Sequence, residues 1–189
     1  LHAIAAIAEL KLPVKITSYL CLAENMPSGS AMRPGDVFQA RNGKTVEVTN
    51  PDAEGRLVLA DGISAASEEE PDLIVDVATL TGAARVALGI RYTGLMGSAA
   101  GVAAIEAAAA EAGELVWEMP LASELRSALD SPVADLQNSK VGSTFGGMLV
   151  GGWFIHEFVG TKKDGTKLDW AHLDIAGPAD NEGSAYGYT

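Results

Sequence analysis

Hydrophobic and polar positions along the chain alternate between a helical and a strand period. Helical spacing predicts helices at 1–10, 55–67, 83–88, 101–112, 124–129 and 147–159. Strand-like runs fall between them, at 14–22, 37–40, 45–48, 73–80, 92–97 and 170–175. Alternating strands and helices are typical of βαβ units. We therefore expect one α/β domain over residues 1–189, with a mostly parallel twisted sheet and helices on both of its faces.

Two of the predicted strands carry a further expectation about burial. The run 73–80 is almost continuously apolar, which is typical of a central parallel strand buried on both faces. The run 16–22 also predicts a buried strand, and it contains Cys21, the only cysteine of the chain. A single cysteine excludes an internal disulfide and a cysteine-based zinc site. We expect Cys21 to be a packed thiol.

The charge of the chain narrows the classes of partner. There are 13 Lys and Arg against 25 Asp and Glu, which gives a net charge of −12, and the basic residues are scattered. Nucleic acid and anionic membranes are therefore excluded as expected partners, whereas cations are compatible with the acidic surface. No apolar run reaches the length of a membrane span or fits a signal peptide. We expect a soluble cytoplasmic protein.

The most informative chemistry follows the predicted strand at 45–48. Asp52 and Glu54 stand two positions apart in the turn that leads into a helix, and Arg56 follows them. In open α/β sheets, ligands bind where strands end, and two carboxylates there are suited to a divalent cation. The spacing also fits a helix cap by Asp52, with Glu54 favoured by the helix dipole. From spacing alone, both readings remain open.

Two other strand ends carry segments that can face the same crevice. The segment 79–82 follows the run 73–80, and the segment 175–179 follows the last predicted strand. Glycines in both segments permit close approach of the backbone to a ligand. Nucleotide-binding glycine motifs, a nucleophilic serine elbow and a His-Glu-x-x-His zinc motif are all absent from the sequence. His156 and His172 therefore fit structural roles better than catalytic ones.

Taken together, four ordered segments resemble the leucyl (cytosol) aminopeptidases, which are binuclear zinc or manganese exopeptidases. The matching segments are 24–36, 50–57, 75–83 and 172–177, with Pro51 where the family usually has Thr. The resemblance implies the three-layer fold of the zinc exopeptidases and the release of leucine-like amino-terminal residues from peptides. It also implies a homo-hexamer for the full-length protein.

The resemblance assigns a role to each strand-end residue. Asp52 and Glu54 would be metal ligands, with Glu54 bridging two zinc or manganese ions. Arg56 would be catalytic, because it would stabilise the tetrahedral intermediate and hold a bicarbonate that carries protons. The substrate-binding residues would be Thr79, Leu80, Gly82, Ala176 and Ala179. Plain strand core or loop packing remains the alternative for this last group.

One departure from the family limits these expectations. In the family, further metal ligands (one Lys and two Asp) and a second catalytic Lys come from a segment that would precede Leu1. The apolar helical period also begins at Leu1, without a methionine or a capping residue. We therefore expect a carboxy-terminal catalytic fragment that alone binds metal weakly or not at all and is inactive. The alternatives are a non-catalytic scaffold or interaction domain with the same fold and, with less support, a one-metal hydrolase of another family.

Overall fold

The computed structural model describes residues 1–179 of the chain. Its helices are α1 (His2–Glu9), α2 (Glu54–Glu68), α3 (Gly82–Leu88), α4 (Ala99–Ala112) and α5 (Gly147–His156), with 3₁₀ turns η1 (Pro51–Ala53) and η2 (Ser123–Leu129). Its strands are β1 (Val37–Gln39), β2 (Thr45–Glu47), β3 (Ile74–Ala78), β4 (Thr93–Gly97), β5 (Val116–Glu118), β6 (Leu136–Gln137) and β7 (Trp170–Asp174). Most predicted elements are therefore confirmed within a few residues.

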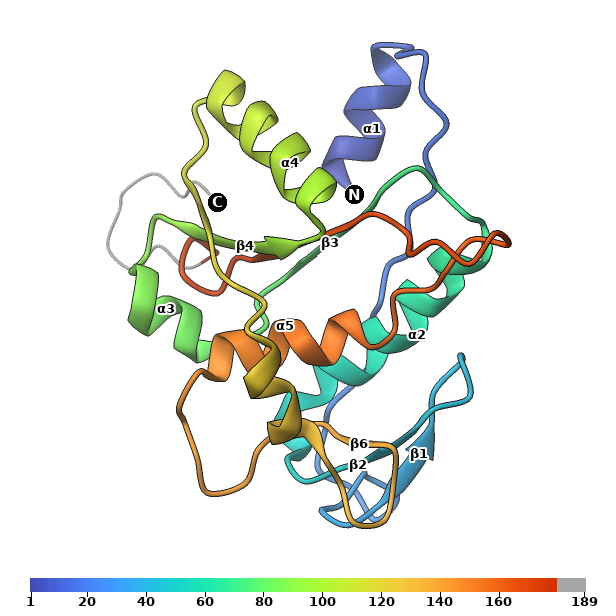
Figure 1. Cartoon of the computed structure of the whole chain (residues 1–189), viewed down its shortest axis with the longest axis vertical. Coiled ribbons are helices and arrows are strands. Elements are labelled where there is room, and N and C mark those ends of the chain that lie inside the picture. The colour runs from blue at the N-terminus through green and yellow to red at the C-terminus, as the bar shows by residue number, and fades with distance from the viewer. Residues whose placement is uncertain (180–189) are drawn as a thin grey trace.

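The larger sheet has the strand order β3-β7-β4-β5, and helices cover both of its faces (Figure 1). Strands β3 and β7 are parallel, as are β4 and β5, whereas β4 runs antiparallel to β7. Helix α4 packs on one face, and α2, α3 and α5 lie on the other side of the sheet. The α/β class is confirmed, but the sheet is mixed where we expected a mostly parallel one.

The expectation of a central strand at 73–80 is wrong for the described residues. β3 is an edge strand of the larger sheet, and its side chains alternate between buried and exposed. Ile74 and Asp76 are buried, whereas Val75 and Val77 are 44% and 55% exposed. Helix α4 contacts β4 and β7, whereas alternate side chains of β3 stay exposed among residues 1–179, so an apolar run here does not mean burial on both faces.

A second, smaller sheet lies on the other side of α2 and α5 from the larger sheet (Figure 1). Its order is β1-β2-β6, with β1 and β2 antiparallel and β6 parallel to β2. The predicted hairpin around Asn42 and Gly43 is confirmed, and Gly43 has a φ of +90°, which glycine adopts without strain. The small sheet leads directly into η1 and α2, where the predicted carboxylate turn lies.

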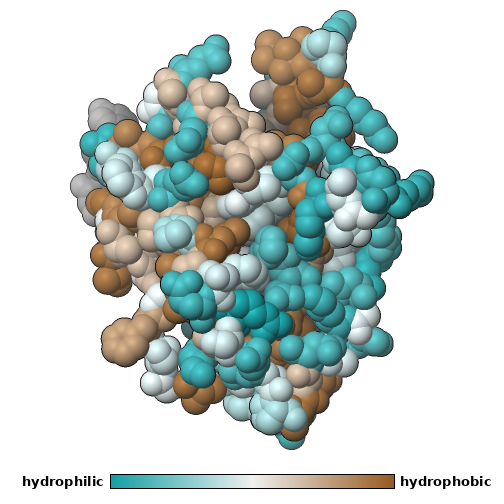
Figure 2. Space-filling view, viewed as in Figure 1, coloured by the Kyte–Doolittle hydropathy of each residue, from teal (hydrophilic) through white to brown (hydrophobic). Residues whose placement is uncertain are grey.

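The largest hydrophobic core lies between the two sheets, around α2 and α5. Val46, Leu136, Phe154, Phe158 and Trp170 are among its side chains, and each is at most 1% exposed. Helix α5 is apolar on all sides, which suits a helix packed between other elements. On the face shown in Figure 2, hydrophobic residues also gather over α1, which has no buried residue.

The predicted strand at 14–22 is not formed. The segment is extended but pairs with no strand among residues 1–179, and Ile16, Leu20 and Leu22 are exposed. A β-branched run becomes a strand only where another strand accepts its hydrogen bonds, and none does so here. Cys21 is partly buried and packs against Gly62 of α2, and this burial raises the pKa of its thiol. Within residues 1–179, no helix is long and apolar enough to cross a membrane.

Candidate active site

The start of α2 separates the two readings of Asp52. The cap of this turn is Asn50, whose Oδ1 accepts a hydrogen bond from the Asp52 backbone N at 3.0 Å. Pro51 follows at a position where its fixed φ suits the first helical turn. Helix α2 has no side-chain cap of its own. The capping role is thus taken by Asn50, and the Asp52 carboxylate remains exposed and available to a ligand.

Glu54 and Arg56 lie in the first turn of α2 and face different partners. Asn25 donates its Nδ2 to Glu54 Oε2 at 2.9 Å and to the Pro51 carbonyl at 3.2 Å, which fixes the turn to the upstream loop. Arg56 points inward and donates Nη1 to the Asn138 carbonyl at 2.7 Å. The helix therefore presents carboxylates outside and a guanidinium inside.

Asn138 organises the approach to this helix and was not anticipated from the sequence. It is fully buried, and its side-chain amide accepts from the Thr49 and Asn50 backbone N atoms and donates to the Asn50 carbonyl at 2.7 Å. Its own carbonyl accepts from Arg56. Asn138 is 88 residues from Asn50 and 82 from Arg56 in the sequence, and it lies in no periodic element. The local sequence pattern therefore does not predict this role.

Arg56 retains an unused donor at the centre of the site. The side chain is buried, and its Nε has no hydrogen-bond partner among residues 1–179. Burial lowers the pKa of Arg56, while the negative charge of Asp174 acts to raise it. A buried guanidinium with a free N–H is suited to an anionic oxygen, which it can bind through a charge-assisted hydrogen bond.

Gly151 of α5 marks the point where three elements meet. A Cβ at this position would lie 2.9 Å from Thr81 Cγ2, 3.3 Å from Leu80 Cδ2 and 3.4 Å from Arg56 Nη2. Only a glycine leaves room for α2, α5 and the turn after β3 to approach this closely. Arg56 and the Leu80–Thr81 turn are thus brought together, although β2, which precedes α2, belongs to the smaller sheet and is not a neighbour of β3 and β7 as we expected. In the sequence, the feature that could have indicated this close approach is a glycine inside an apolar helix.

The remaining predicted substrate residues lie in the two turns that follow β3 and β7. Thr79 and Gly82 are exposed, with Gly82 at the first position of α3. Ala176 and Ala179 are partly buried after β7, and the Ala176 N donates to Asp174 Oδ1 at 3.2 Å. Asp174 also accepts from the Leu80 N at 3.2 Å, which joins the two turns. Their contact with a peptide remains a prediction.

The donor set at the turn fits half of a metal centre. Asp52 and Glu54 are oxygen donors of the kind that zinc and manganese accept, and both lie at the start of α2. No group of three or more His, Cys, Asp or Glu able to hold a metal occurs among residues 1–179. A divalent ion takes about four to six ligands. These residues therefore fit a divalent ion only together with donors from elsewhere.

His156 and His172 pack against other side chains inside the fold. His172 is fully buried, and its Nδ1 lies 2.6 Å from Asp76 Oδ1, while Trp170 Nε1 donates to Asp76 Oδ2 at 2.7 Å. His156 packs against Trp153 and Trp170, and burial lowers its pKa. Neither histidine joins Asp52 and Glu54 in a metal cluster within the described residues. A structural role for both histidines remains a prediction.

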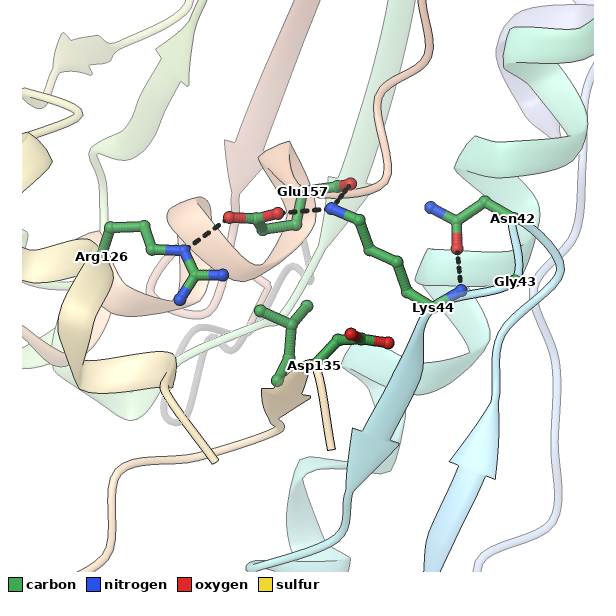
Figure 3. Close-up of a pocket in the computed structure, with 7 residues that line it drawn as sticks. Asn42, Gly43, Lys44, Arg126, Asp135 and Glu157 are labelled. Atoms are coloured by element: carbon green, nitrogen blue, oxygen red, sulfur yellow. Dashed lines mark hydrogen bonds and ion pairs between the residues drawn. The ribbon is translucent and has the colours of Figure 1, made fainter. Parts of the chain in front are cut away.

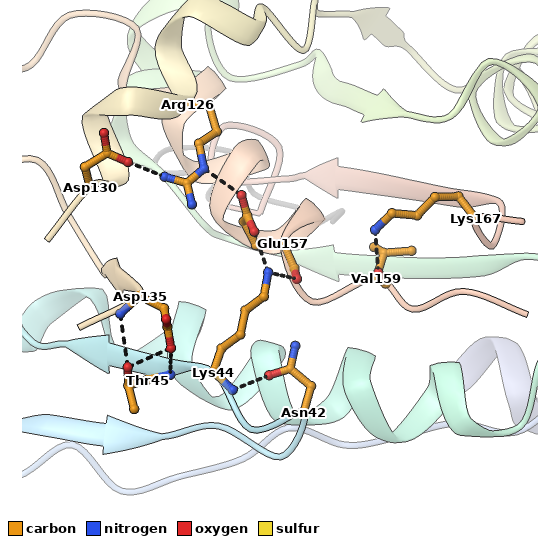
Figure 4. Close-up of polar contacts among 9 residues, drawn as sticks. All are labelled: Asn42, Lys44, Thr45, Arg126, Asp130, Asp135, Glu157, Val159 and Lys167. Atoms are coloured by element: carbon orange, nitrogen blue, oxygen red, sulfur yellow. Dashed lines mark hydrogen bonds and ion pairs between the residues drawn. The ribbon is translucent and has the colours of Figure 1, made fainter. Parts of the chain in front are cut away.

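A cavity of about 440 Å³ lies elsewhere, between the β1–β2 hairpin, η2 and the end of α5 (Figure 3). In this view Arg126 and Lys44 approach the Glu157 carboxylate from opposite sides. Arg126 also pairs with Asp130, and Asp135 accepts from Thr45 (Figure 4). The charged groups of this cavity neutralise one another, so we interpret the network as a clamp between elements and not as a catalytic site.

Replacing Glu157 by Gln should weaken this clamp and change how stability depends on pH. The pKa of Glu157 is lowered: burial acts to raise it, but the hydrogen bonds and charges of Lys44 and Arg126 outweigh burial. A depressed carboxyl pKa stabilises the fold above the unfolded value, near pH 4.3, and this contribution is lost as the pH falls through the folded value. We expect Glu157→Gln to cost about 1–3 kcal/mol of unfolding free energy at neutral pH.

Urea unfolding between neutral and acidic pH checks this expectation. The variant should lose less stability than the wild type on acidification, because it lacks the carboxylate that protonates. Glu106→Gln, at an exposed position of α4, is the matched control and should leave the pH dependence unchanged. Parallel pH profiles for Glu157→Gln and wild type would contradict the clamp.

Asp52, Glu54 and the buried Arg56 thus follow the end of a strand in an α/β fold, a place where such folds bind ligands. A sequence profile of the cytosol aminopeptidase family, catalytic domain, matches residues 1–189. The chain belongs to the cytosol aminopeptidase family, whose members are metal-dependent aminopeptidases. The resemblance of the four segments is thereby confirmed.

Relatives and solved structures agree with this assignment. A probable cytosol aminopeptidase of Leifsonia xyli subsp. xyli is 60% identical over 100% of this chain and 39% of its own length. One of Streptomyces coelicolor is 57% identical over 99% of this chain and 35% of its own length. The chain thus spans less than two fifths of these curated relatives.

Among solved structures, the bottromycin maturation enzyme BotP superposes with a TM-score of 0.84 at 40% identity, covering 95% of this chain and 39% of that one. A mutant of tomato leucine aminopeptidase gives a TM-score of 0.77 at 41% identity, covering 84% of this chain and 30% of that one. The aminopeptidase fold is thereby confirmed.

Proposed function

We propose that this chain is the carboxy-terminal catalytic part of an aminopeptidase that releases leucine-like residues from the amino termini of peptides. The observation that carries the proposal is the start of α2. There Asn50 takes the capping role, which leaves the Asp52 carboxylate exposed, two positions before Glu54 and four before the buried Arg56. The names of the relatives support a cytoplasmic location, and the family resemblance favours a homo-hexamer of the full-length protein.

In this proposal Asp52 and Glu54 would be ligands of a pair of zinc or manganese ions, as the family resemblance implies. The bound ions would supply a water of lowered pKa as nucleophile. Because no group of three or more His, Cys, Asp or Glu able to hold a metal occurs among the described residues, this proposal takes the remaining ligands from outside them. The 189-residue chain alone is accordingly expected to bind metal weakly and to be inactive.

Arg56 acts on the charge that develops during peptide hydrolysis. Its Nη1 is held by the Asn138 carbonyl, so the guanidinium is fixed before substrate binds. In this proposal the Arg56 guanidinium, whose buried Nε has no partner among residues 1–179, would donate to the anionic oxygen of the tetrahedral intermediate or to a bicarbonate that moves the proton. The turns with Thr79, Leu80 and Gly82 on one side and Ala176 and Ala179 on the other receive the first side chain of the peptide.

An anilide assay with metal removal and addition tests this proposal. The full-length protein should hydrolyse leucyl-p-nitroanilide, lose that activity on chelation, and regain it with Zn²⁺ or Mn²⁺. The 189-residue chain alone should show neither tightly bound ions nor turnover. Undiminished turnover after complete metal removal would contradict the proposed chemistry. Two tightly bound ions in the chain alone would contradict the half-site, and an inactive but correctly assembled full-length protein would favour a scaffold role.

A further inference from the structure

Asp174 is a fully buried carboxylate at the end of β7 that binds two separate turns. Its Oδ1 accepts from the backbone N atoms of Leu80 at 3.2 Å and Thr81 at 3.4 Å, in the turn after β3. The same oxygen accepts from the Ala176 N at 3.2 Å, in the turn after β7. Its Oδ2 accepts from Thr81 Oγ1 at 2.7 Å. One carboxylate thus serves donors from the ends of two neighbouring strands.

The sheet register explains why these turns meet at Asp174. Asp174 is paired with Ala78 in the parallel β3–β7 ladder, so the two chains leave the sheet together just beyond this pair. Thr81 extends the link, because its Oγ1 also accepts from the Ala84 N and thereby caps α3. Without the carboxylate, the three backbone N–H groups would lose their common acceptor, which is costly above all for the buried Thr81 N–H.

The charge of Asp174 is also felt by Arg56. Burial lowers the pKa of Arg56, and the Asp174 carboxylate is the charge that opposes this effect. The close approach of Arg56, Leu80 and Thr81 around Gly151 places the guanidinium beside the turn that Asp174 holds. Asp174 is therefore linked to the proposed substrate turns by hydrogen bonds and to the Arg56 guanidinium by electrostatic attraction.

We propose that Asp174 is a positioning residue for peptide hydrolysis, which fixes the Leu80–Thr81 turn against Ala176 and so sets the width of the pocket for the first side chain. This inference rests on the proposed function, because it assigns the two turns to opposite sides of that pocket. It predicts that the hydrogen-bond acceptor at Asp174 controls selectivity between large and small amino-terminal residues.

Hydrogen exchange of the full-length protein tests, without any substrate, whether Asp174 holds the two turns together. In Asp174→Ala, the amides of Leu80, Thr81 and Ala176 should lose protection, while the β3–β7 ladder keeps it. Asp174→Asn retains a carbonyl oxygen for these amides and should keep them protected. Asp76→Ala removes another buried carboxylate from the same sheet and is the matched control, with unchanged protection in both turns. Full protection of the turns in Asp174→Ala would overturn the proposal.

Steady-state kinetics on leucyl and alanyl anilides test the effect on selectivity. Asp174→Ala should lower the preference for leucyl over alanyl substrate, measured as the ratio of kcat/KM values, by roughly tenfold, which is within the range that pocket contacts control. Asp174→Asn and Asp76→Ala should keep this ratio within about twofold of wild type. An unchanged ratio in Asp174→Ala, or equal losses in Asp174→Ala and Asp174→Asn, would overturn the proposal. A wild-type protein without turnover would instead contradict the proposed function. The exchange experiment would still show whether Asp174 holds the two turns together.

Discussion

Glu54→Gln in the full-length protein is expected to lower kcat/KM on leucyl-p-nitroanilide by about a thousandfold, at the upper end of what loss of a key electrostatic group costs. The substitution removes the charge that would bridge two ions but keeps a carbonyl oxygen for the hydrogen bond from Asn25. Bound metal should fall in parallel with activity, because a neutral amide is a much poorer ligand than a carboxylate. Metal analysis and kinetics on the same preparation check both effects.

Glu68→Gln is the matched control for this variant. Glu68 lies in the last turn of the same helix and pairs with Arg41 on the surface, so its loss should leave metal content and turnover unchanged. Wild-type turnover by Glu54→Gln, at wild-type metal content, would remove Glu54 from the metal centre. The helix-dipole reading of this residue would then be the better one.

Arg56→Lys should lower kcat by about a hundredfold and change KM much less, because the lost interactions form mainly as charge develops in the reaction. A lysine keeps one positive charge but lacks the planar fork that can hold the Asn138 carbonyl and an anionic oxygen together. Burial, which already lowers the pKa of Arg56, would also favour loss of the lysine proton. As the pH is raised, the variant should therefore lose activity at a lower pH than the wild type does.

Rate profiles against pH for Arg56→Lys and Arg41→Lys make this comparison. Arg41 is exposed and pairs with Glu68, so its replacement should leave both kcat and the alkaline side of the profile unchanged. If Arg56→Lys and Arg41→Lys behaved alike, Arg56 would be a structural residue that only anchors Asn138.

The sequence predicted elements well where the hydrophobic period is long and the core partner lies within the chain. Helices α2, α4 and α5 and strands β4 and β7 are examples. The expectation was wrong for the run 16–22, since a strand requires a partner that no periodicity in the run itself can reveal. The apolar run of β3 likewise does not reveal its neighbours. It predicts a central strand, although β3 lies at the edge of the sheet with Val75 and Val77 exposed.

Residue type and spacing found the candidate site itself only in part. The positions of Asp52, Glu54 and Arg56 at a strand exit were sufficient to single them out, but spacing could not decide between a cap and a ligand. The structure favours the ligand reading because Asn50 forms the cap. Asn138 and Asp174 act through contacts with residues more than 80 positions away, which a local pattern does not encode.

The central claim is that the start of α2 carries half of a two-metal centre. Anomalous diffraction from crystals of the full-length protein grown with Zn²⁺ tests it most directly. We predict two zinc peaks a few ångströms apart, both in contact with the Glu54 carboxylate and one of them with Asp52, and the remaining ligands contributed from outside residues 1–179. Zinc bound elsewhere, with Asp52 and Glu54 free of metal in an active crystal form, would contradict the claim.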